Sequence, residues 1–95
     1  MSAYVYILAS RRNGTLYIGV TTNLAARLHS HRIGRGSAFV KTYRVHRLVY
    51  VEAFDDVRQA IQREKTMKER PRAWKLRTIE AANPLWEDLF ADLNR

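Results

Sequence analysis

The architecture follows from residues 3–20, which read AYVYILASRRNGTLYIGV. The segments 3–9 and 16–20 are short and rich in β-branched and aromatic residues, a composition that favours β-strands. Between them stands the dipeptide Asn13-Gly14, the strongest short-range signal of a tight hairpin turn. We therefore predict that the chain opens with two antiparallel strands.

A two-residue turn would place Arg12 opposite Thr15 and Leu8 opposite Gly19. In that register one face of the hairpin carries Tyr4, Tyr6, Leu8, Tyr17 and Gly19. Two phenols then flank a residue without a side chain, a position where a ligand or another backbone can approach closely. The alternative is that both tyrosines pack, with their hydroxyls reaching water.

Helical patterns and one more strand follow the hairpin. Thr22 or Asn23 can cap a helix over residues 24–33, and residues 38–44 can hold a short helical turn. Residues 46–54 contain a nearly continuous apolar run, which is typical of a strand covered on both faces.

Two further helices are expected after this strand. Asp55-Asp56 can cap a helix over residues 57–69, because a carboxylate accepts hydrogen bonds from the first N–H groups of a helix. Pro71 would end this helix, and residues 72–82 would form the next one. The order of elements predicts an α+β fold, a small three-stranded antiparallel sheet flanked by helices.

The C-terminal segment has the pattern of one more helix. Beyond Asn83-Pro84, residues 85–93 are spaced as in an amphipathic helix. Its inward side would carry Leu85, Trp86, Leu89, Phe90 and Leu93. We expect residues 1–82 to form the domain and residues 83–95 to pack on it.

The charge of the chain indicates a class of partner. Lys and Arg number 17 against 9 Asp and Glu, a formal net charge of +8. Such an excess favours polyanions, although a generic basic or ribosome-associated protein would show it too. The absence of cysteine excludes disulfides and thiolate metal sites. No apolar run approaches the roughly 20 residues of a membrane-spanning helix, so we expect a cytoplasmic protein without a membrane partner.

Arg27 and His31 are four residues apart on the first predicted helix and therefore share one face. They lie beside the apolar stripe of Leu24 and Leu28. Either residue alone would be read as a solvated surface group. Together they place a fixed cation and a titratable imidazole at the edge of the contact with the sheet.

Glu64 lies within the apolar stripe of its helix, between Ala60 and Met67. A carboxylate on an inward face needs a partner, because leaving it unpaired is costly. Two alternatives follow, an ion pair with Arg27 or a lysine, and a ligand of Mg²⁺. One carboxylate suits Mg²⁺, which keeps several waters, whereas the spacing of the histidines does not suit zinc.

These residues, in this order, resemble the GIY-YIG endonuclease domain over about residues 3–80. The likeness rests on Tyr4-Val5-Tyr6, Tyr17-Ile18-Gly19, Asn23-Leu24, Arg27, His31 and Glu64. The first triplet departs from the usual Gly-Ile-Tyr and keeps its tyrosine, Tyr6. Further likeness to the small stand-alone bacterial members of the family lies in Arg63-Glu64-Lys65, Lys68 and Asn83-Pro84-Leu85-Trp86.

The resemblance implies a metal-dependent endonuclease that hydrolyses DNA phosphodiesters in repair or processing and leaves a 5′-phosphate and a 3′-hydroxyl. Glu64 would hold Mg²⁺ or Mn²⁺ against the phosphate. Tyr6, aided by Tyr17, would take a proton from the attacking water, and a cationic setting would have to favour its phenolate. Arg27 would stabilise the developing charge, and His31 would hydrogen-bond a tyrosine or relay its proton.

Other basic residues could form a track for the DNA backbone. They are Arg32, Arg35, Lys41, Arg44, Lys65 and Lys68, with the aromatic Phe39 and Tyr43 among them able to meet a base. Ordinary surface charge is the alternative for each of them. Because no base-reading helix is evident, we expect selection by DNA structure, branched or single-stranded, over selection by sequence.

Two other functions remain open at this point. A catalytically silent nucleic-acid-binding domain would bind DNA or RNA without cleaving it. A protein-interaction module would use exposed apolar residues of the segment 85–93.

Overall fold

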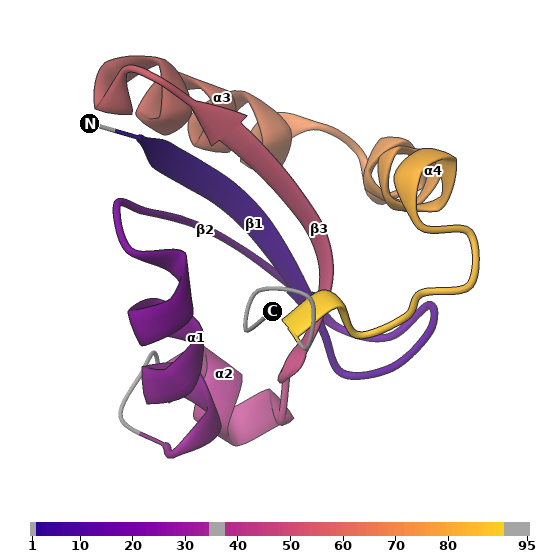
Figure 1. Ribbon diagram of the computed structural model, residues 1–95. Coiled ribbons are helices and arrows are strands. Elements are labelled where there is room, and N and C mark those ends of the chain that lie inside the picture. The colour runs from indigo at the N-terminus through magenta and orange to yellow at the C-terminus, as the bar shows by residue number, and fades with distance from the viewer. Residues whose placement is uncertain (1, 35–37, 91–95) are drawn as a thin grey trace.

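The computed structural model describes residues 2–34 and 38–90 (Figure 1). Along the chain, the elements are β1 (Ala3–Ala9), β2 (Leu16–Thr21), α1 (Leu24–Arg32), α2 (Ala38–Tyr43), β3 (Arg47–Phe54), α3 (Val57–Glu69) and α4 (Arg72–Ala82). The strands form an antiparallel sheet in the order β2-β1-β3, so that β1 is central. The predicted α+β fold with a three-stranded sheet is confirmed.

Helices cover both faces of this sheet, with α1 and α2 on one side and α3 and α4 on the other (Figure 1). Alternate residues of β1 therefore enter two separate cores. Tyr6 and Leu8 pack with residues of α1 and α2, and Val5 and Ile7 pack with residues of α3 and α4. Burial on both faces explains the nearly continuous apolar sequence of β1.

The predicted register of the hairpin is wrong by two residues. Tyr6 pairs with Gly19, and Leu8 pairs with Tyr17 in place of Gly19. A strand shows the same side chains on the same face after any shift by an even number of residues. The predicted face, with Tyr4, Tyr6, Leu8, Tyr17 and Gly19 together, is therefore unaffected.

The turn explains the shift, because it contains four residues and not two. The Ser10 N–H donates to the Thr15 carbonyl oxygen at 3.0 Å and closes the ladder there. Inside this pair, the Gly14 N–H donates to the Arg11 carbonyl oxygen at 2.9 Å. Asn13 takes the left-handed conformation, with φ of 58°, that asparagine tolerates in turns.

The predicted helix over residues 85–93 is wrong in its first half, and residues 91–93 lie outside the described part of the chain. Residues 84 and 85 form a turn, and residues 86–88 follow an irregular path. Leu85, predicted to point inward, is 66% exposed, whereas Trp86 is buried at a positive φ of 56°.

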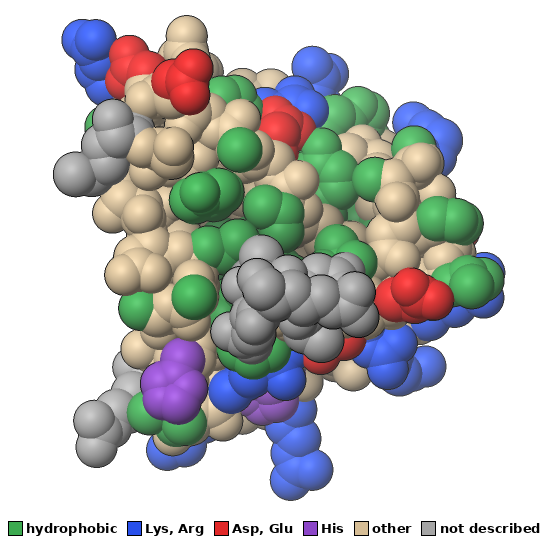
Figure 2. Space-filling model, viewed as in Figure 1, with side chains coloured by type: hydrophobic (Ala, Val, Ile, Leu, Met, Phe, Trp, Pro, Cys, Tyr) green, Lys and Arg blue, Asp and Glu red, His purple; other side chains and the backbone are tan. Residues whose placement is uncertain are grey.

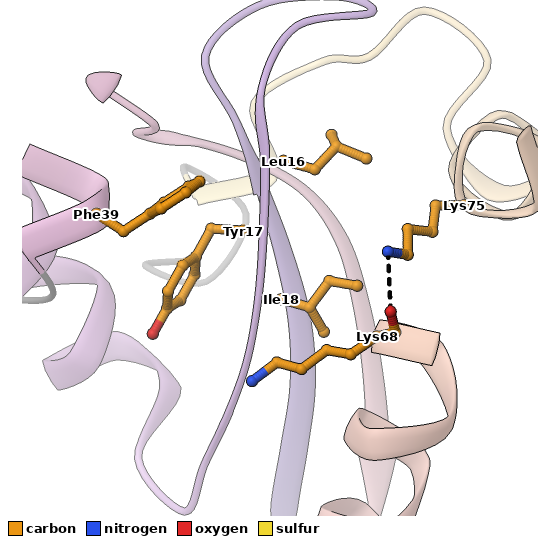
Figure 3. A pocket seen from close by; sticks show the side chains of 6 residues that line it. All are labelled: Leu16, Tyr17, Ile18, Phe39, Lys68 and Lys75. Atoms are coloured by element: carbon orange, nitrogen blue, oxygen red, sulfur yellow. Dashed lines mark hydrogen bonds between the residues drawn. The ribbon is translucent and has the colours of Figure 1, made fainter. Parts of the chain in front are cut away.

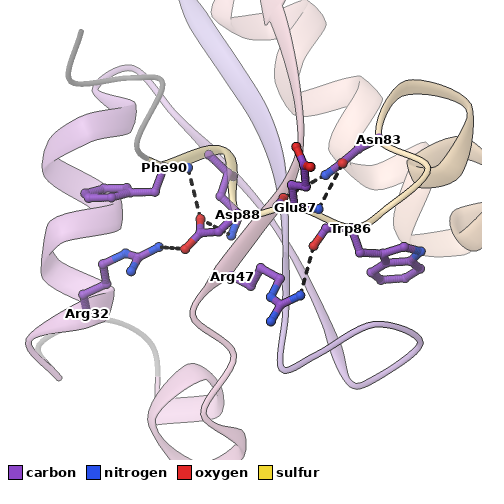
Figure 4. Close-up of polar contacts among 8 residues, drawn as sticks. Arg32, Arg47, Asn83, Trp86, Glu87, Asp88 and Phe90 are labelled. Carbon is purple, nitrogen blue, oxygen red and sulfur yellow. Dashed lines mark hydrogen bonds and ion pairs between the residues drawn. The ribbon is translucent and has the colours of Figure 1, made fainter.

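Side chains account for this path by bonding backbone groups that a helix would have used. The Asn83 amide donates to the carbonyl oxygen of Val49. It also donates to the Glu87 carbonyl oxygen, and its own oxygen accepts from the Glu87 N–H (Figure 4). Asp88 in turn accepts from the N–H groups of Leu48 and Phe90. The segment is thus tied to the start of β3 by side-chain hydrogen bonds.

Within residues 2–34 and 38–90, no helix has the length and apolar character required to cross a membrane.

Candidate active site

Tyr6 lies at the centre of the site, on the face of β1 that α1 covers. Its side chain is 1% exposed and extends across the neighbouring strand, over Gly19. A Cβ atom at position 19 would lie only 2.5 Å from the Tyr6 hydroxyl oxygen. Glycine is therefore required at this position for the phenol to reach past β2.

The Tyr6 hydroxyl contacts His31, which lies in the last turn of α1. The Asn23 side chain caps α1 by accepting from the Ala26 N–H at 3.2 Å, and Leu24, Leu28 and His31 then form the buried stripe. The Tyr6 hydroxyl and His31 Nε2 lie 3.1 Å apart in a buried hydrogen bond. A hydrogen bond between His31 and a tyrosine, expected from the sequence, is thus present.

Both partners of this bond are shifted toward their neutral forms. Burial raises the pKa of Tyr6 above that of a free phenol, and the neighbouring Tyr17 raises it further. Burial lowers the pKa of His31 from its usual 6.5, and the positive charges of Arg27 and His46 act in the same direction. Burial thus favours a neutral phenol beside a neutral imidazole, and the tautomer of His31 decides which of the two donates. His31 Nδ1 has no hydrogen-bond partner among the described residues.

These pKa shifts bear on how Tyr6 could ionise. We expected a cationic setting to favour the Tyr6 phenolate, and Arg27 does lower the pKa of Tyr6. Burial raises the pKa of Tyr6 by more than Arg27 lowers it, and the negative charge of Glu64 raises it as well. Ionisation of Tyr6 in this protein therefore requires a proton acceptor or further positive charge.

Tyr17 completes a cluster of three rings. Its ring centroid lies 6.3 Å from that of Tyr6 and 5.5 Å from that of His31. Tyr17 is half-buried and stands on β2, the edge strand. The cluster thus joins the buried Tyr6 to the surface.

Arg27 and Glu64 approach the cluster from opposite sides of the sheet. Arg27 is exposed on α1. Glu64 belongs to α3, and its side chain is 16% exposed. Both charges act on the pKa of Tyr6. Of the five residues predicted from the sequence, the structure thus brings Tyr6, Tyr17 and His31 into ring contact, and Arg27 and Glu64 act on Tyr6 through their charges.

Glu64 has the ion pair that was one of its two alternatives, and the partner is Lys68. Glu64 Oε1 and Lys68 Nζ lie 3.4 Å apart, one turn of helix from each other. The Lys68 side chain is 54% exposed, so the pair is partly screened by water. It does not lock Glu64 in the interior.

The donor set at Glu64 fits a divalent cation of the Mg²⁺ type. Among residues 2–34 and 38–90, no group of three or more His, Asp or Glu side chains is placed to share a metal ion. Mg²⁺ does not need such a group, because it binds through one or two carboxylates, waters and substrate phosphate. A single half-buried carboxylate beside the phenols is compatible with that mode.

The remaining basic residues of the predicted track are dispersed. Arg32 pairs with Asp88 at 2.6 Å and lies 4.1 Å from the Phe90 ring centroid, so its guanidinium is held by the C-terminal segment (Figure 4). Lys41, Arg44 and Lys65 are exposed, and Arg35 lies outside the described residues. The face in Figure 2 shows Lys and Arg around its margin and not in a continuous band.

An open groove adjoins Tyr17 along β2. Its volume is about 310 Å³, and it is lined by Leu16, Tyr17, Ile18, Phe39, Lys68 and Lys75. Figure 3 shows the two aromatic rings on one side of β2 and the two lysines on the other. The sequence analysis missed Lys75, because no periodicity relates residues on α3 and α4, which Pro71 separates.

Comparisons with known proteins agree with this arrangement. The family model described as the GIY-YIG catalytic domain matches residues 2–77. A UPF0213 protein of Staphylococcus haemolyticus is 43% identical over 77 residues, which are 81% of this chain and 93% of the relative. A UPF0213 protein of Natronomonas pharaonis is 40% identical over 76 residues, 80% of this chain and 88% of the relative. The solution NMR structure of a UPF0213 protein from Bacillus halodurans has a TM-score of 0.59, with 30% identity and 93% of each chain covered.

Proposed function

The chain belongs to the GIY-YIG family, and on this premise we propose that it is a metal-dependent endonuclease that hydrolyses phosphodiester bonds of DNA. The family is one of nucleases. The observation that carries the proposal is the buried hydrogen bond between Tyr6 and His31, next to Tyr17 and within reach of the charges of Arg27 and Glu64.

In the proposed reaction, water attacks the phosphorus atom and Tyr6 receives the proton of that water. A neutral phenol accepts a proton only as it loses its own, so the Tyr6 proton passes to His31 Nε2, 3.1 Å away. The transfer creates an imidazolium in a site that lowers the pKa of His31. The negative charge of the substrate phosphate would offset this effect, because it favours the cation.

In this reaction, Arg27 would bind the phosphate and Glu64 would bind the metal ion. The exposed Arg27 guanidinium would pair with a non-bridging phosphate oxygen and stabilise the charge that develops on it. Glu64 would supply the carboxylate oxygen for Mg²⁺ or Mn²⁺, an ion that stabilises negative charge on the leaving 3′ oxygen. Lys68 would release Glu64 in exchange for a phosphate oxygen.

We propose selection by DNA structure over selection by sequence, in DNA repair or processing in the cytoplasm. The support is chemical, because the charged residues of the site recognise phosphates, and phosphate contacts carry no sequence information. The protein-interaction alternative is weakened. Among the apolar residues of this segment up to position 90, Trp86 is buried, Leu89 and Phe90 pack on the core under α1, and Leu85 is exposed.

The test is nicking of supercoiled, branched and single-stranded DNA with and without Mg²⁺ or Mn²⁺. Glu64→Ala and Arg27→Ala should each lose activity while remaining folded. Glu69→Ala removes an exposed carboxylate from the same helix and should nick like the parent chain. Salt-sensitive binding without any cleavage would instead identify a silent binding domain, and equal nicking by all variants would indicate a contaminant.

A further inference from the structure

We propose that the groove along β2 binds one unpaired nucleotide next to the cleaved bond, with its base against Phe39 and its phosphate between Lys68 and Lys75. This inference rests on the proposed function and deepens it, because it names a substrate class. That class is DNA with a single-stranded segment beside the cut, such as a flap or a splayed end.

The position of the groove determines which part of a substrate can reach it. Tyr17 belongs both to the ring cluster with Tyr6 and His31 and to the wall of the groove. Lys68 also has two roles, since it lines the groove and contacts the Glu64 carboxylate at 3.4 Å. A strand whose phosphate lies at Tyr6 and Glu64 therefore places its adjoining nucleotide in the groove.

The lysine side of the groove suits a phosphate. Lys75 Nζ donates to the Lys68 carbonyl oxygen at 3.3 Å, which brings both lysines to the same wall (Figure 3). An ammonium has three N–H donors, and each of these contacts uses one of them. Two ammonium groups on one wall give the groove the charge that complements a phosphate.

The aromatic side suits a base. Phe39 is 40% exposed and Tyr43 is 53% exposed, and their ring centroids lie 4.7 Å apart. The Phe39 centroid also lies 6.0 Å from that of Tyr17. A line of rings thus runs from the site to the surface. Large exposed rings beside a basic wall are how proteins bind single strands, by stacking on the face of each base.

Such a groove distinguishes unpaired from paired DNA. In a duplex, both faces of a base are covered by its neighbours, and only its edges are accessible. An unpaired base exposes a face that can stack on Phe39. With a volume of about 310 Å³, the groove is at the small end of ligand sites and suits one nucleotide, not a duplex.

The experiment measures binding without cleavage. The full chain is titrated in EDTA, and again with Ca²⁺, into single-stranded, flapped and fully paired oligonucleotides that each carry one 2-aminopurine. Anisotropy reports affinity, and 2-aminopurine quenching reports stacking. The variants are Phe39→Ala, Phe39→Leu, which keeps apolar volume without a π-face, and Lys75→Ala. Thr42→Ala and Arg77→Ala are the controls on α2 and α4, with folding checked by thermal denaturation.

We expect Phe39→Ala and Phe39→Leu to weaken binding of the single strand and the flap about tenfold, and to abolish quenching. Affinity for the duplex should stay within about twofold. Lys75→Ala should reduce the salt dependence of single-strand binding by about one ion, and Arg77→Ala should not. Equal losses on single-stranded and paired DNA, or quenching that survives in both Phe39 variants, would overturn the inference.

Failure of the proposed function gives a different result. A chain that cleaves nothing, yet quenches 2-aminopurine through Phe39, supports the groove and refutes the nuclease. A chain that nicks duplex DNA and shows no Phe39-dependent quenching refutes the groove and leaves the nuclease standing.

Discussion

The two faces of the sheet bury different kinds of side chain. Under α3 and α4 the fully buried side chains are apolar, with Ile7, Met67 and Ile79 at 0% exposure, apart from the indole nitrogen of Trp86, which has no hydrogen-bond partner among the described residues. Under α1 the buried set includes a phenol and an imidazole joined by a hydrogen bond, and the other imidazole nitrogen has no hydrogen-bond partner in the part of the chain that the structure describes. A buried polar atom without a partner costs stability. The core under α3 and α4 thus stabilises the fold by apolar packing, whereas the core under α1 also holds two buried groups that can exchange a proton.

The largest effect should come from removal of one oxygen on the α1 face. Tyr6→Phe should lower the rate of nicking by about 10²–10⁴-fold, the usual contribution of a general base. It should lower the free energy of unfolding by only about 1 kcal/mol, because the lost hydrogen bond leaves a neutral partner. Single-turnover cleavage and urea denaturation measure the two quantities.

Tyr50→Phe is the matched control on β3. The Tyr50 hydroxyl donates to Glu52, and burial, followed by this bond, raises the pKa of Tyr50 to about 12. Removal of this oxygen should leave nicking unchanged. If Tyr50→Phe reduces nicking as much as Tyr6→Phe does, the loss in Tyr6→Phe does not reflect a specific proton-transfer role of Tyr6.

The next effect tests the other face. Ile79→Ala removes a fully buried side chain of α4 and should lower the free energy of unfolding by about 2–5 kcal/mol. Cleavage per folded molecule should not change, because α4 contributes no residue to the ring cluster. A variant as stable as the parent chain would show that this core is not the stabilising one.

A smaller effect concerns pH and stability. The pKa of His31 is lowered in the folded protein, so below its usual value of 6.5 the unfolded chain binds a proton that the folded chain does not. Stability should therefore fall as the pH drops from about 7 toward 5. Thermal denaturation of the parent chain and of His31→Gln measures this, and the pH dependence in this range should be weaker in the variant. If the stability of His31→Gln depends on pH as strongly as that of the parent chain, other titratable groups cause the dependence.

The smallest effect concerns the edge of the site, where α3 carries Glu64 and Lys68. Lys68→Ala removes the partner of Glu64 and should raise the affinity for Mg²⁺ about twofold, as expected for the loss of a surface ion pair of about 0.5 kcal/mol. Lys65→Ala removes the same charge from the same helix and should change this affinity less. Calorimetric titration measures the Mg²⁺ affinity of both variants. Equal changes in affinity would show that only the net charge matters and not the contact between Lys68 and Glu64.

Local patterns predicted much of this molecule because they report which side of an element is buried. The spacing of Leu24, Leu28 and His31 predicted a helix face, and all three residues are buried. The hairpin faces were predicted correctly despite a register error, because that error was an even number of residues. The apolar spacing of the C-terminal segment predicted a helix that its first residues do not form. Hydrogen bonds between β3 and the side chains of Asn83 and Asp88 hold this segment in another path, and such bonds leave no periodic pattern in the sequence.

The sequence by itself determined the order of the elements and the buried sides of the hairpin and of α1, because side chains on one face recur every two residues in a strand and every three or four in a helix. The tertiary structure decided that Tyr6 crosses over Gly19 to His31, that Lys68 contacts Glu64 while lining a groove with Lys75, and that α1 and α3 bring charges to one phenol from opposite faces. Periodicity shows that a face is covered. It cannot show which distant element covers it, since that depends on how the whole sheet and its helices pack.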